Sequence, residues 1–458
     1  MRILFALHQF FPEHQAGTEV VTLGLARQLR ARGHEPFVLA PKRSIPFSEL
    51  APGEIEDYEV EGIPVRRIGR QTESSTRTYH LGYRSDVMAA RARDWVRETG
   101  PDVVHAMHFQ ALTTSVVPVF HEFGLPVVYT ATDFWAICPV VDMRRHDESV
   151  CAGPELAHCI RCVAKGNISA PAAALLSRAP DALIGGAVRA AGTPLSRHSA
   201  SLRQVQDVAR RRAHVQAGID RVDHVTVPSN FMRDMLTAHG VGRGEIEVSR
   251  HGIDTSRIER RAPDAAPPSP VRIGLIGTLA EHKGCDILIR AFRKLPAHLD
   301  ATLTIHGNLK RFPPYVRELR ALASNDARIT FAGTFPRERI GRTLGAIDVL
   351  VVPSRWYENS PLVIFEAFAA GVPVVATDLG GMAEAVASEG DGLLFELEDV
   401  DDLARQLRRL IEEPGLIARL RAGIGPVKTV EEDAAQLERL YERLIRQRRG
   451  TVPEPAGR

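Results

Sequence analysis

The sequence predicts an α/β protein made of two units, each built on a parallel β-sheet. Short apolar runs with the composition of buried strands alternate with amphipathic helical patterns along the whole chain. A Pro- and Ala-rich stretch at residues 260–270, RRAPDAAPPSP, has the composition of a linker and separates two such series. The length of 458 residues also exceeds that of one ordinary domain.

The first series begins with a strand at residues 2–7, RILFAL. This apolar start runs into His8 and lacks a small-residue cleavage site, so it is interpreted as a buried strand and not as a signal peptide. An amphipathic helix follows at residues 18–35, where Gly33 suits the left-handed position that ends helices. Further strands of this series are predicted at 35–41, 102–108, 125–133 and 224–229.

Strands of the second series are predicted at 271–277, 301–307, 328–333, 348–354 and 372–378. The predicted division is therefore a first domain at 1–255, a linker at 256–270 and a second domain at 271–430. The last stretch, 431–458, is expected to form a helix that packs back on the first domain. The segment IGLIGTLAEHKG lacks the Gly-x-Gly-x-x-Gly spacing, which disfavours a nicotinamide enzyme.

Composition narrows the classes of function. Apolar residues make up 44% and charged residues 25% of the chain, as in ordinary globular domains. The net charge of +2 gives no sign of a nucleic-acid partner, so none is expected. No apolar run has the length of a membrane span. Five cysteines without an export signal predict a reducing, cytoplasmic location.

Two carboxylates stand in an otherwise apolar segment, RWYENSPLVIFEAFAAGVPVV, at 355–375. A buried strand precedes this segment, so Glu358 is predicted in the loop at the carboxyl end of that strand. Ser360 is predicted as the N-cap and Pro361 as the first residue of the following helix. Glu366 then falls about a turn and a half inside that helix.

This placement suits a nucleotide-sugar. Ligands of open α/β sheets bind at the carboxyl ends of strands, and a helix N-terminus there attracts phosphate. Two carboxylates can accept hydrogen bonds from the hydroxyls of a ribose and of a sugar on either side of a diphosphate. The alternative is that Glu358 is a solvated loop charge and Glu366 pairs with a nearby arginine.

Lys283 and Gly17 support the same interpretation. Lys283 precedes the helix that follows the strand at 271–277, where its ammonium group can neutralise a diphosphate. Gly17 lies at the turn into the first helix, where the lack of a side chain lets the backbone approach a ligand. The alternatives are an ordinary exposed lysine and a plain turn glycine.

Taken together, these motifs resemble the retaining glycosyltransferases of family 4. The strongest part is the pair of glutamates within PSRWYENSPLVIFEAFAAGVPVVATDLGGMAE, and AGTE, SRHGID, GTLAEHKG and DGLLF support it in the order that the family has them. The resemblance covers nearly the whole chain. It implies a GT-B fold, in which two Rossmann-like domains face each other across a cleft.

The resemblance also implies roles for individual residues. Glu358 would bind hydroxyls of the donor sugar, Glu366 the ribose and Lys283 the diphosphate. The implied donor-binding set is Gly17, Gly277, Lys283, Arg355, Glu358, Ser360, Leu362 and Glu366, and the implied catalytic set is Glu358, Lys283 and Asp133. The family needs no divalent metal when side-chain cations and a helix end carry the leaving group's charge, so no cofactor is expected for catalysis.

Two positions depart from the family pattern. Thr278 stands where the family usually has arginine, and Arg355 is the candidate for the missing cation. Thr132 stands where relatives often have a histidine that lies near the donor sugar and the reaction centre. The acceptor-side candidates near strand ends are His105, His108 and Asp133.

Four cysteines fall within a stretch of 25 residues: Cys138, Cys151, Cys159 and Cys162. Four thiolates in one loop-rich segment suit a tetrahedral structural zinc site. Their irregular spacing leaves reduced free thiols as the alternative.

Residues 165–215 form a basic insertion with eight Lys or Arg and two acidic residues. This insertion is expected to meet an anionic membrane or a lipid-diphosphate acceptor, at the inner face of the membrane. A solvated helical hairpin is the alternative.

The leading hypothesis is a retaining glycosyltransferase that moves a sugar from a UDP- or GDP-sugar to a glycan or lipid-linked acceptor in cell-surface polysaccharide biosynthesis. Three alternatives use a similar fold. An epimerase would turn over the nucleotide-sugar without an acceptor, and a phosphorylase would need a larger chain and a cofactor lysine. A nucleotide-sugar-binding protein would lack transferase activity.

Overall fold

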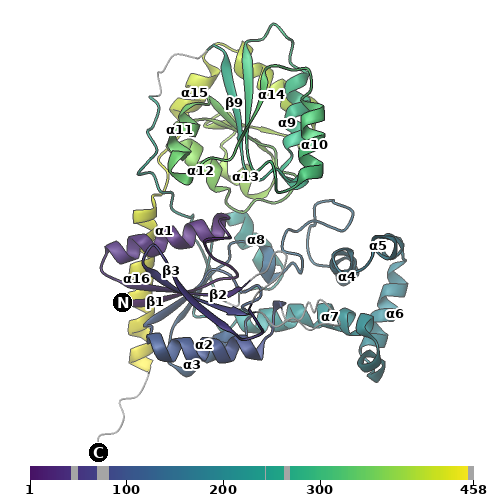
Figure 1. Ribbon diagram of the computed structural model, residues 1–458, viewed down its shortest axis with the longest axis vertical. Helices are drawn as coiled ribbons and strands as arrows, with labels where there is room; N and C mark the ends of the chain where they lie inside the picture. The colour runs from purple at the N-terminus through teal and green to yellow at the C-terminus, as the bar shows by residue number, and fades with distance from the viewer. Residues whose placement is uncertain (43–49, 70–81, 243, 263–268, 452–458) are drawn as a thin grey trace, which may run out of the picture. The chain divides into compact units, whose positions relative to one another are not determined.

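The computed structural model describes residues 1–42, 50–69, 82–242, 244–262 and 269–451 (Figure 1). The chain divides into two compact units. The first comprises Met1–Ser249 together with Glu431–Arg458, and the second comprises Arg250–Val430. Every helix within the described ranges is too short or too polar to cross a membrane.

The second unit begins earlier than the sequence predicts. Ile253 forms a parallel β-bridge with Thr429, and its N–H donates a hydrogen bond to the carbonyl of Lys428. Part of the predicted linker, residues 263–268, lies outside the described residues.

An eight-stranded sheet forms the middle of the first unit, in the order β3-β4-β2-β1-β5-β6-β7-β8. Neighbouring strands run parallel except β3 and β4, which form an antiparallel pair. The parallel strands have near-continuous apolar sequences because helices cover both faces of such a sheet. The strands are β1 (Arg2–Ala6), β2 (Glu35–Lys42), β3 (Ile55–Val60), β4 (Ile63–Gly69), β5 (Val103–Ala106), β6 (Val127–Thr130), β7 (His224–Val227) and β8 (Ile246–Val248).

The last helix of the chain belongs to this first unit. Its Tyr441 is fully buried, and the hydroxyl lies 2.5 Å from Nδ1 of His105 in β5. Glu438 on the same helix accepts hydrogen bonds from Arg32 and lies 2.8 Å from Nε2 of His34. The helices around the sheet are α1 (Gly17–Ala31), α2 (Asp86–Thr99), α3 (Val116–Glu122), α8 (Asn230–Ala238) and α16 (Val430–Thr451).

A helical insertion lies between β6 and β7. The long helix α7 contacts the rest of the first unit through Tyr83, whose hydroxyl donates to the carbonyl of Asp207 at 3.1 Å. Within the insertion, Arg211 of α7 packs over the ring of Trp135 and donates to its carbonyl. Figure 1 shows α5 and α6 at the end of α7 that lies away from the sheet. The elements of this insertion are η2 (Phe134–Ala136), α4 (Leu156–Lys165), α5 (Ala170–Ser177), α6 (Asp181–Ala191), η3 (Pro194–His198) and α7 (Ala200–Ile219).

A six-stranded parallel sheet forms the middle of the second unit, in the order β11-β10-β9-β12-β13-β14. The strand order reverses between β9 and β12, and ligands of such sheets bind at the carboxyl ends of strands beside this switch. The strands are β9 (Val271–Ile276), β10 (Ala301–His306), β11 (Ile329–Gly333), β12 (Val349–Val352), β13 (Val374–Thr377) and β14 (Gly392–Phe395).

Helices pack against both faces of this second sheet over two apolar clusters. The helical elements are η4 (Glu281–Lys283), α9 (Cys285–Arg293), α10 (Pro313–Leu322), η5 (Arg337–Arg339), α11 (Ile340–Gly345), α12 (Leu362–Ala369), α13 (Gly380–Ala385), α14 (Val400–Glu412) and α15 (Leu416–Gly423).

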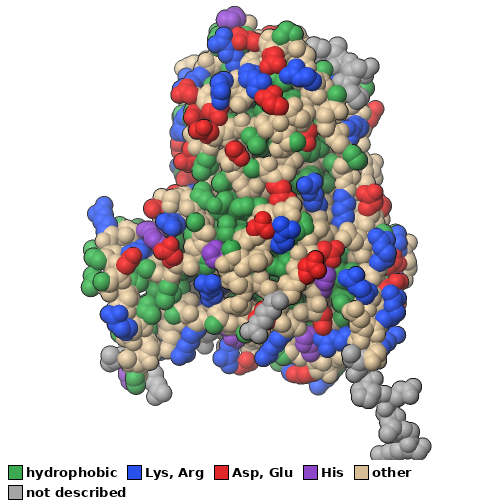
Figure 2. All heavy atoms as spheres, turned by 180° about the vertical axis from the view of Figure 1, so that it is seen from behind, with side chains coloured by type: hydrophobic (Ala, Val, Ile, Leu, Met, Phe, Trp, Pro, Cys, Tyr) green, Lys and Arg blue, Asp and Glu red, His purple; other side chains and the backbone are tan. Residues whose placement is uncertain are grey.

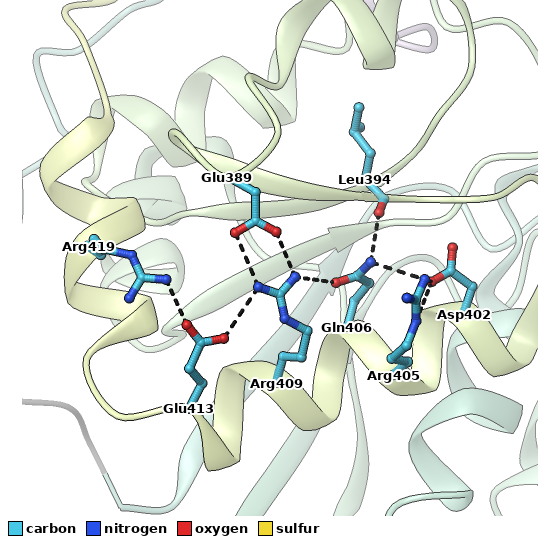
Figure 3. Close-up of polar contacts among 8 residues, drawn as sticks. All are labelled: Glu389, Leu394, Asp402, Arg405, Gln406, Arg409, Glu413 and Arg419. Carbon is cyan, nitrogen blue, oxygen red and sulfur yellow. Dashed lines mark hydrogen bonds and ion pairs between the residues drawn. The ribbon is translucent and has the colours of Figure 1, made fainter.

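A chain of surface ion pairs runs along α14 (Figure 3). Arg409 lies 2.7 Å from Glu389, and it also contacts Glu413, which Arg419 contacts in turn at 2.8 Å. Gln406 donates to the carbonyl of Leu394 in β14, so the network joins α14 to the edge of the sheet.

Candidate active site

The loop after β9 is held directly against the loop after β12. Gly284 has a φ of +67°, and a Cβ there would lie 1.9 Å from the carbonyl oxygen of Pro353. Only glycine therefore permits this close approach. The N–H of Arg355 also donates to the carbonyl of His282 at 2.8 Å. Lys283, which ends η4, is thereby placed at the switch between β9 and β12.

A buried carboxylate in α9 holds the loop after β12 in place. Asp286 is 3% exposed, and both its oxygens accept hydrogen bonds from the guanidinium of Arg355 at 2.7 Å. Burial tends to raise the pKa of Asp286, but hydrogen bonds from Arg355 and from Tyr315 outweigh it and hold the pKa below its ordinary value. Arg355 lies 2.8 Å from Glu398 as well. The guanidinium of Arg355 is thus paired with two carboxylates, and its role as a donor-binding cation stays a prediction.

Glu358 and Lys283 are in contact. Oε1 of Glu358 accepts hydrogen bonds from Lys283 Nζ at 2.5 Å, from Trp356 Nε1 at 2.8 Å and from Ser354 Oγ at 2.9 Å. Its side chain is 14% exposed, and although burial tends to raise the pKa of this carboxyl, the charge of Lys283 and the three hydrogen bonds hold it below the ordinary value. Lys283 also lies over the ring of Trp356 at 4.7 Å. The structure thus brings two predicted site residues together.

The helix after this loop starts later than the sequence predicts. Pro361 is the N-cap of α12, and no side chain caps it, so the prediction of Ser360 as N-cap is wrong. The buried hydroxyl of Ser360 makes no hydrogen bond to the described residues. Leu362 is the first residue of the helix, so its N–H lies in the first turn, where N–H groups lack partners within the helix.

Gly381, which follows β13, packs directly against the loop that carries Glu358. The N–H of Gly381 donates to the carbonyl of Glu358 at 2.9 Å. A Cβ on Gly381 would lie 2.3 Å from the carbonyl oxygens of Glu358 and Asn359. Any side chain at this position would therefore displace the loop that carries Glu358.

Glu366 lies inside α12 and is nearly inaccessible. Its side chain is 3% exposed, and its Oε1 accepts a hydrogen bond from Arg337. Burial raises the pKa of Glu366 above the ordinary value, and Arg337 only partly offsets it. The pair with an arginine is the alternative that the sequence left open, and the binding of ribose by Glu366 stays a prediction. Arg337 comes from η5, and no spacing in the sequence points to it.

The carboxyl edge of the first sheet holds a second polar cluster. Nε2 of His108, which follows β5, lies 2.5 Å from Oδ2 of Asp133, which follows β6. The N–H of Gln110 donates to Nδ1 of His108 at 2.9 Å, so Nε2 carries the proton and donates to Asp133. The other oxygen of Asp133 accepts from the N–H of Trp135 at 2.8 Å. These two acceptor-side candidates therefore form one hydrogen-bonded pair.

Two further members of this cluster were not identified from the sequence. The ring of His8, which follows β1, lies 4.1 Å from that of His108. His8 Nε2 is 3.5 Å from Oε1 of Glu19, a fully buried carboxylate in the first turn of α1. Both positions could have been found, because His8 directly follows the predicted strand at residues 2–7 and Glu19 belongs to the AGTE motif.

The remaining predicted residues lie as follows. His105 is not at this edge, because its ring nitrogens contact Tyr441 and Thr130 within the packing of α16 on the sheet. Gly17 is the exposed first residue of α1. Gly277 follows β9, and a Cβ there would have no heavy atom within 4 Å.

The predicted zinc site is not formed by the residues that the structure describes, among which no three His, Cys, Asp or Glu side chains are grouped to hold a metal ion. All four cysteines are free thiols. The thiol of Cys151 donates to the carbonyl of Gly153 at 3.1 Å. Burial raises the pKa of Cys138 and of Cys159 to about 12.

Two parts of the chain match known families. Residues 16–148 match the family described as Glycosyltransferase Family 4, and residues 270–413 match that described as Glycosyl transferases group 1. The fold is similar to that of Anabaena Alr3699/HepE in complex with UDP, with a TM-score of 0.58, 19% identity, and 99% of this chain and 100% of that chain covered.

Curated relatives match over part of their length. The chain is 30% identical over 253 residues to the D-inositol 3-phosphate glycosyltransferase of Mycolicibacterium smegmatis, covering 53% of this chain and 58% of that protein. It is 30% identical over 217 residues to the lipopolysaccharide core biosynthesis mannosyltransferase LpsB of Rhizobium meliloti, covering 43% of this chain and 61% of that protein. The chain spans little more than half the length of these relatives. With its two parallel-sheet α/β units and its two matching regions, the chain belongs to the family 4, group 1 glycosyltransferases of the GT-B fold.

Proposed function

We propose that the protein transfers a sugar, with retention of anomeric configuration, from a UDP- or GDP-sugar to a glycan or lipid-linked acceptor in cell-surface polysaccharide biosynthesis. One observation carries the proposal. Lys283, Glu358 and the start of α12 meet at the switch point of the second sheet, where such folds bind ligands. The relatives named as a lipopolysaccharide mannosyltransferase and an inositol phosphate glycosyltransferase support the general reaction.

The donor's diphosphate would bind between Lys283 and the first turn of α12. The ammonium group is held in place by Glu358 and by the ring of Trp356, so little side-chain order has to be created on binding. The N–H groups of the helix start and the Ser360 hydroxyl can donate to phosphate oxygens. Together these groups would stabilise the negative charge that develops on the leaving diphosphate.

The two glutamates would recognise hydroxyl groups on either side of the diphosphate. Glu358 remains ionised at neutral pH and has a second oxygen, Oε2, for a hydroxyl of the donor sugar. Glu366 would accept hydrogen bonds from the ribose, and Arg337 contacts the same carboxylate. Because a cation and a helix end supply positive charge here, we expect turnover to persist in the presence of EDTA.

The acceptor would bind at the edge of the first sheet that carries His108 and Asp133. Their hydrogen bond fixes the imidazole, and Glu19 and His8 line the same place. In this proposal the leaving diphosphate takes the proton of the acceptor hydroxyl, which attacks from the face that the diphosphate leaves. No separate base is then needed, and the configuration at the anomeric carbon is retained.

A thermal-shift screen over UDP- and GDP-sugars tests the donor site. A true donor at a hundredfold excess over its Kd stabilises the folded state by about 2.7 kcal/mol. It should stabilise the wild type and the control Glu413→Ala, whose side chain lies in the surface network on α14, but not Glu366→Ala. No shift with any nucleotide-sugar would contradict the proposal.

Product analysis then separates transfer from its alternatives. The donor found by the screen is incubated with and without lipid-linked or glycan acceptors, and the anomeric configuration of the product is read by NMR. Turnover only with an acceptor supports transfer. Conversion of the donor sugar without an acceptor indicates an epimerase, and binding without any turnover indicates a binding protein.

A further inference from the structure

The helix α5 has no buried residue. Its sequence, APAAALLS, carries no charge, and Leu175 is 76% exposed. On the next helix Leu183 is 66% exposed, and Ile168 before α5 is 38% exposed. A helix that is apolar all round normally packs inside a protein or a membrane. Packing within the chain therefore does not account for this one.

These exposed side chains border an apolar groove. The groove has a volume of about 730 Å³ and lies between α4, α5, α6 and α7. Ile168, Leu175 and Leu183 all line it, so groove and exposed helix form one continuous apolar surface. Contiguous apolar surface of this kind marks a site of interaction with a partner or a membrane.

The insertion has only a small core of its own beneath this surface. A cluster of four buried side chains forms this core: Ile160, Val163, Ile184 and Val208. Contacts in the middle of α7 hold the insertion instead, where Arg211 contacts Trp135 and the Tyr83 hydroxyl donates to the carbonyl of Asp207 at 3.1 Å. The apolar surface is thus presented at the end of a fixed helix (Figure 1).

The charge beside the apolar surface is positive. No Asp or Glu occurs between residues 156 and 180, and Asp181 is paired with Arg161. Arg178 lines the groove, and both Arg178 and Arg189 are exposed. Figure 2 shows hydrophobic side chains gathered on this projection, at the lower left, with Lys and Arg side chains close by. The apolar side chains of such a surface match the hydrocarbon of a bilayer, and its arginines match anionic lipid headgroups.

We propose that the α4–α6 end of the insertion docks on an anionic lipid bilayer. Leu175 and Leu183 enter the hydrocarbon, and Arg178 and Arg189 contact the headgroups. The proposal does not depend on the transfer reaction, because docking needs neither donor nor acceptor. The occupant is lipid, because uncharged apolar side chains that stay exposed beside arginines match hydrocarbon beneath anionic headgroups.

Flotation of the full-length protein with vesicles tests this proposal. Vesicles of phosphatidylcholine with about a third of phosphatidylglycerol should bind the wild type much more tightly than pure phosphatidylcholine. Leu175→Ser/Leu183→Ser should weaken binding roughly a hundredfold, about tenfold for each leucine withdrawn from hydrocarbon. Arg178→Gln/Arg189→Gln should weaken it about tenfold or more on the anionic vesicles alone.

Control variants replace exposed side chains of the same types on the second unit. Leu397→Ser removes a leucine that is 38% exposed on the second unit, and Arg317→Gln/Arg320→Gln removes two arginines from α10. Both should bind like the wild type. All substituted side chains lie at the surface, and melting temperatures close to that of the wild type would verify folding.

Three outcomes would overturn the proposal. The wild type could fail to bind anionic vesicles, or the leucine variant could bind as tightly as the controls. Sedimentation could also show a dimer of the wild type that the leucine variant lacks, which would assign the surface to a second copy of the chain.

Discussion

Two sets of carboxylates in the second unit have basic partners but lie in opposite surroundings. Along α14, Glu389 and Glu413 contact Arg409 at the surface, and the side chain of Glu389 is 53% exposed. At the carboxyl edge of the sheet, Glu366 contacts Arg337 and its side chain is 3% exposed. The hydrogen bond from Arg409 holds the pKa of Glu389 below its ordinary value, whereas burial raises the pKa of Glu366.

Because both carboxylates are paired and only one is buried, an ion pair alone does not mark a functional site. Exposed pairs contribute about 0–1 kcal/mol to stability and need no further explanation. A buried carboxylate that its partner does not fully compensate lowers stability, and such groups gather at binding and catalytic sites. Substitutions at matched positions in the two regions should therefore act in different ways.

The largest effect is expected from Lys283→Ala. Glu358 would remain buried without its cation, which should lower the free energy of unfolding by about 3 kcal/mol. Loss of the donor's cation should also lower kcat/KM for transfer more than hundredfold, or by about 3 kcal/mol. Denaturant melts and a transfer assay measure the two quantities. Arg419→Ala, which removes a cation from the surface network, should leave both close to the wild type.

A double variant separates the two causes. In Lys283→Ala/Glu358→Gln no charge is left unpaired, so stability should largely return while transfer stays low. Recovery of transfer in the double variant would contradict the role of Lys283 at the diphosphate.

A smaller loss of transfer is expected from Glu366→Gln. Hydrogen bonds from hydroxyls to a charged carboxylate are worth about 1.5–3 kcal/mol, so kcat/KM should fall roughly ten- to hundredfold. Stability at pH 7 should not fall, because the change removes a buried charge. Glu389→Gln is the matched control and should keep full activity. Wild-type activity in Glu366→Gln would make Glu366 a purely structural residue.

The two site glutamates should show opposite pH dependences of stability. The pKa of Glu358 lies below 4.5 in the folded state, so its contribution is present above pH 4.5 and is lost as the pH falls through the folded value. The pKa of Glu366 lies above 4.5, so its contribution is present below pH 4.5 and is lost as the pH rises through the folded value. Denaturant melts from about pH 3.5 to 7.5 test both.

Glu358→Gln should therefore be less stable than the wild type at neutral pH, and this difference should disappear in acid. Glu366→Gln should instead gain relative stability as the pH rises. If the free energies of unfolding of the two variants changed with pH in the same way, the two glutamates would not have oppositely shifted pKa values.

The smallest effect is expected in the surface network. Glu389→Gln should change the free energy of unfolding by about 0.5 kcal/mol, and 1 M salt should abolish the difference. Melts with and without salt would measure it. A difference that persists in high salt would indicate that the network along α14 is more than a set of screened surface charges.

Much of the fold can be predicted from the sequence, because the parallel strands are apolar runs that are easily recognised and clearly bounded there. The meeting of Lys283 with Glu358 follows as well, since both residues come directly after strands that neighbour each other at the switch point. The same reasoning places His108 beside Asp133, because β5 and β6 are adjacent.

Other parts depend on contacts that no local pattern encodes. Arg337 reaches Glu366 from a separate loop, and His105 differs from His108 only in standing inside the strand, where its side chain packs against α16. The helix after Ser360 starts later than the N-cap preference suggests, because the loop is set by Gly381 and not by its own hydroxyl. Cysteines close in sequence need not be grouped in the way that a metal ion requires, because spacing in the sequence does not set the directions of the side chains.

The return of the last helix to the first unit has a consequence for biosynthesis. The second unit is continuous along the chain, whereas the first is completed only by residues that are synthesised after the second unit. On the ribosome the second unit can acquire its full set of strands while the first still lacks Tyr441 and Glu438, the anchors for His105 and Arg32. Nascent chains that stop after residue 430 would thus expose the apolar surface of the first unit that α16 covers, and chaperones bind such surface.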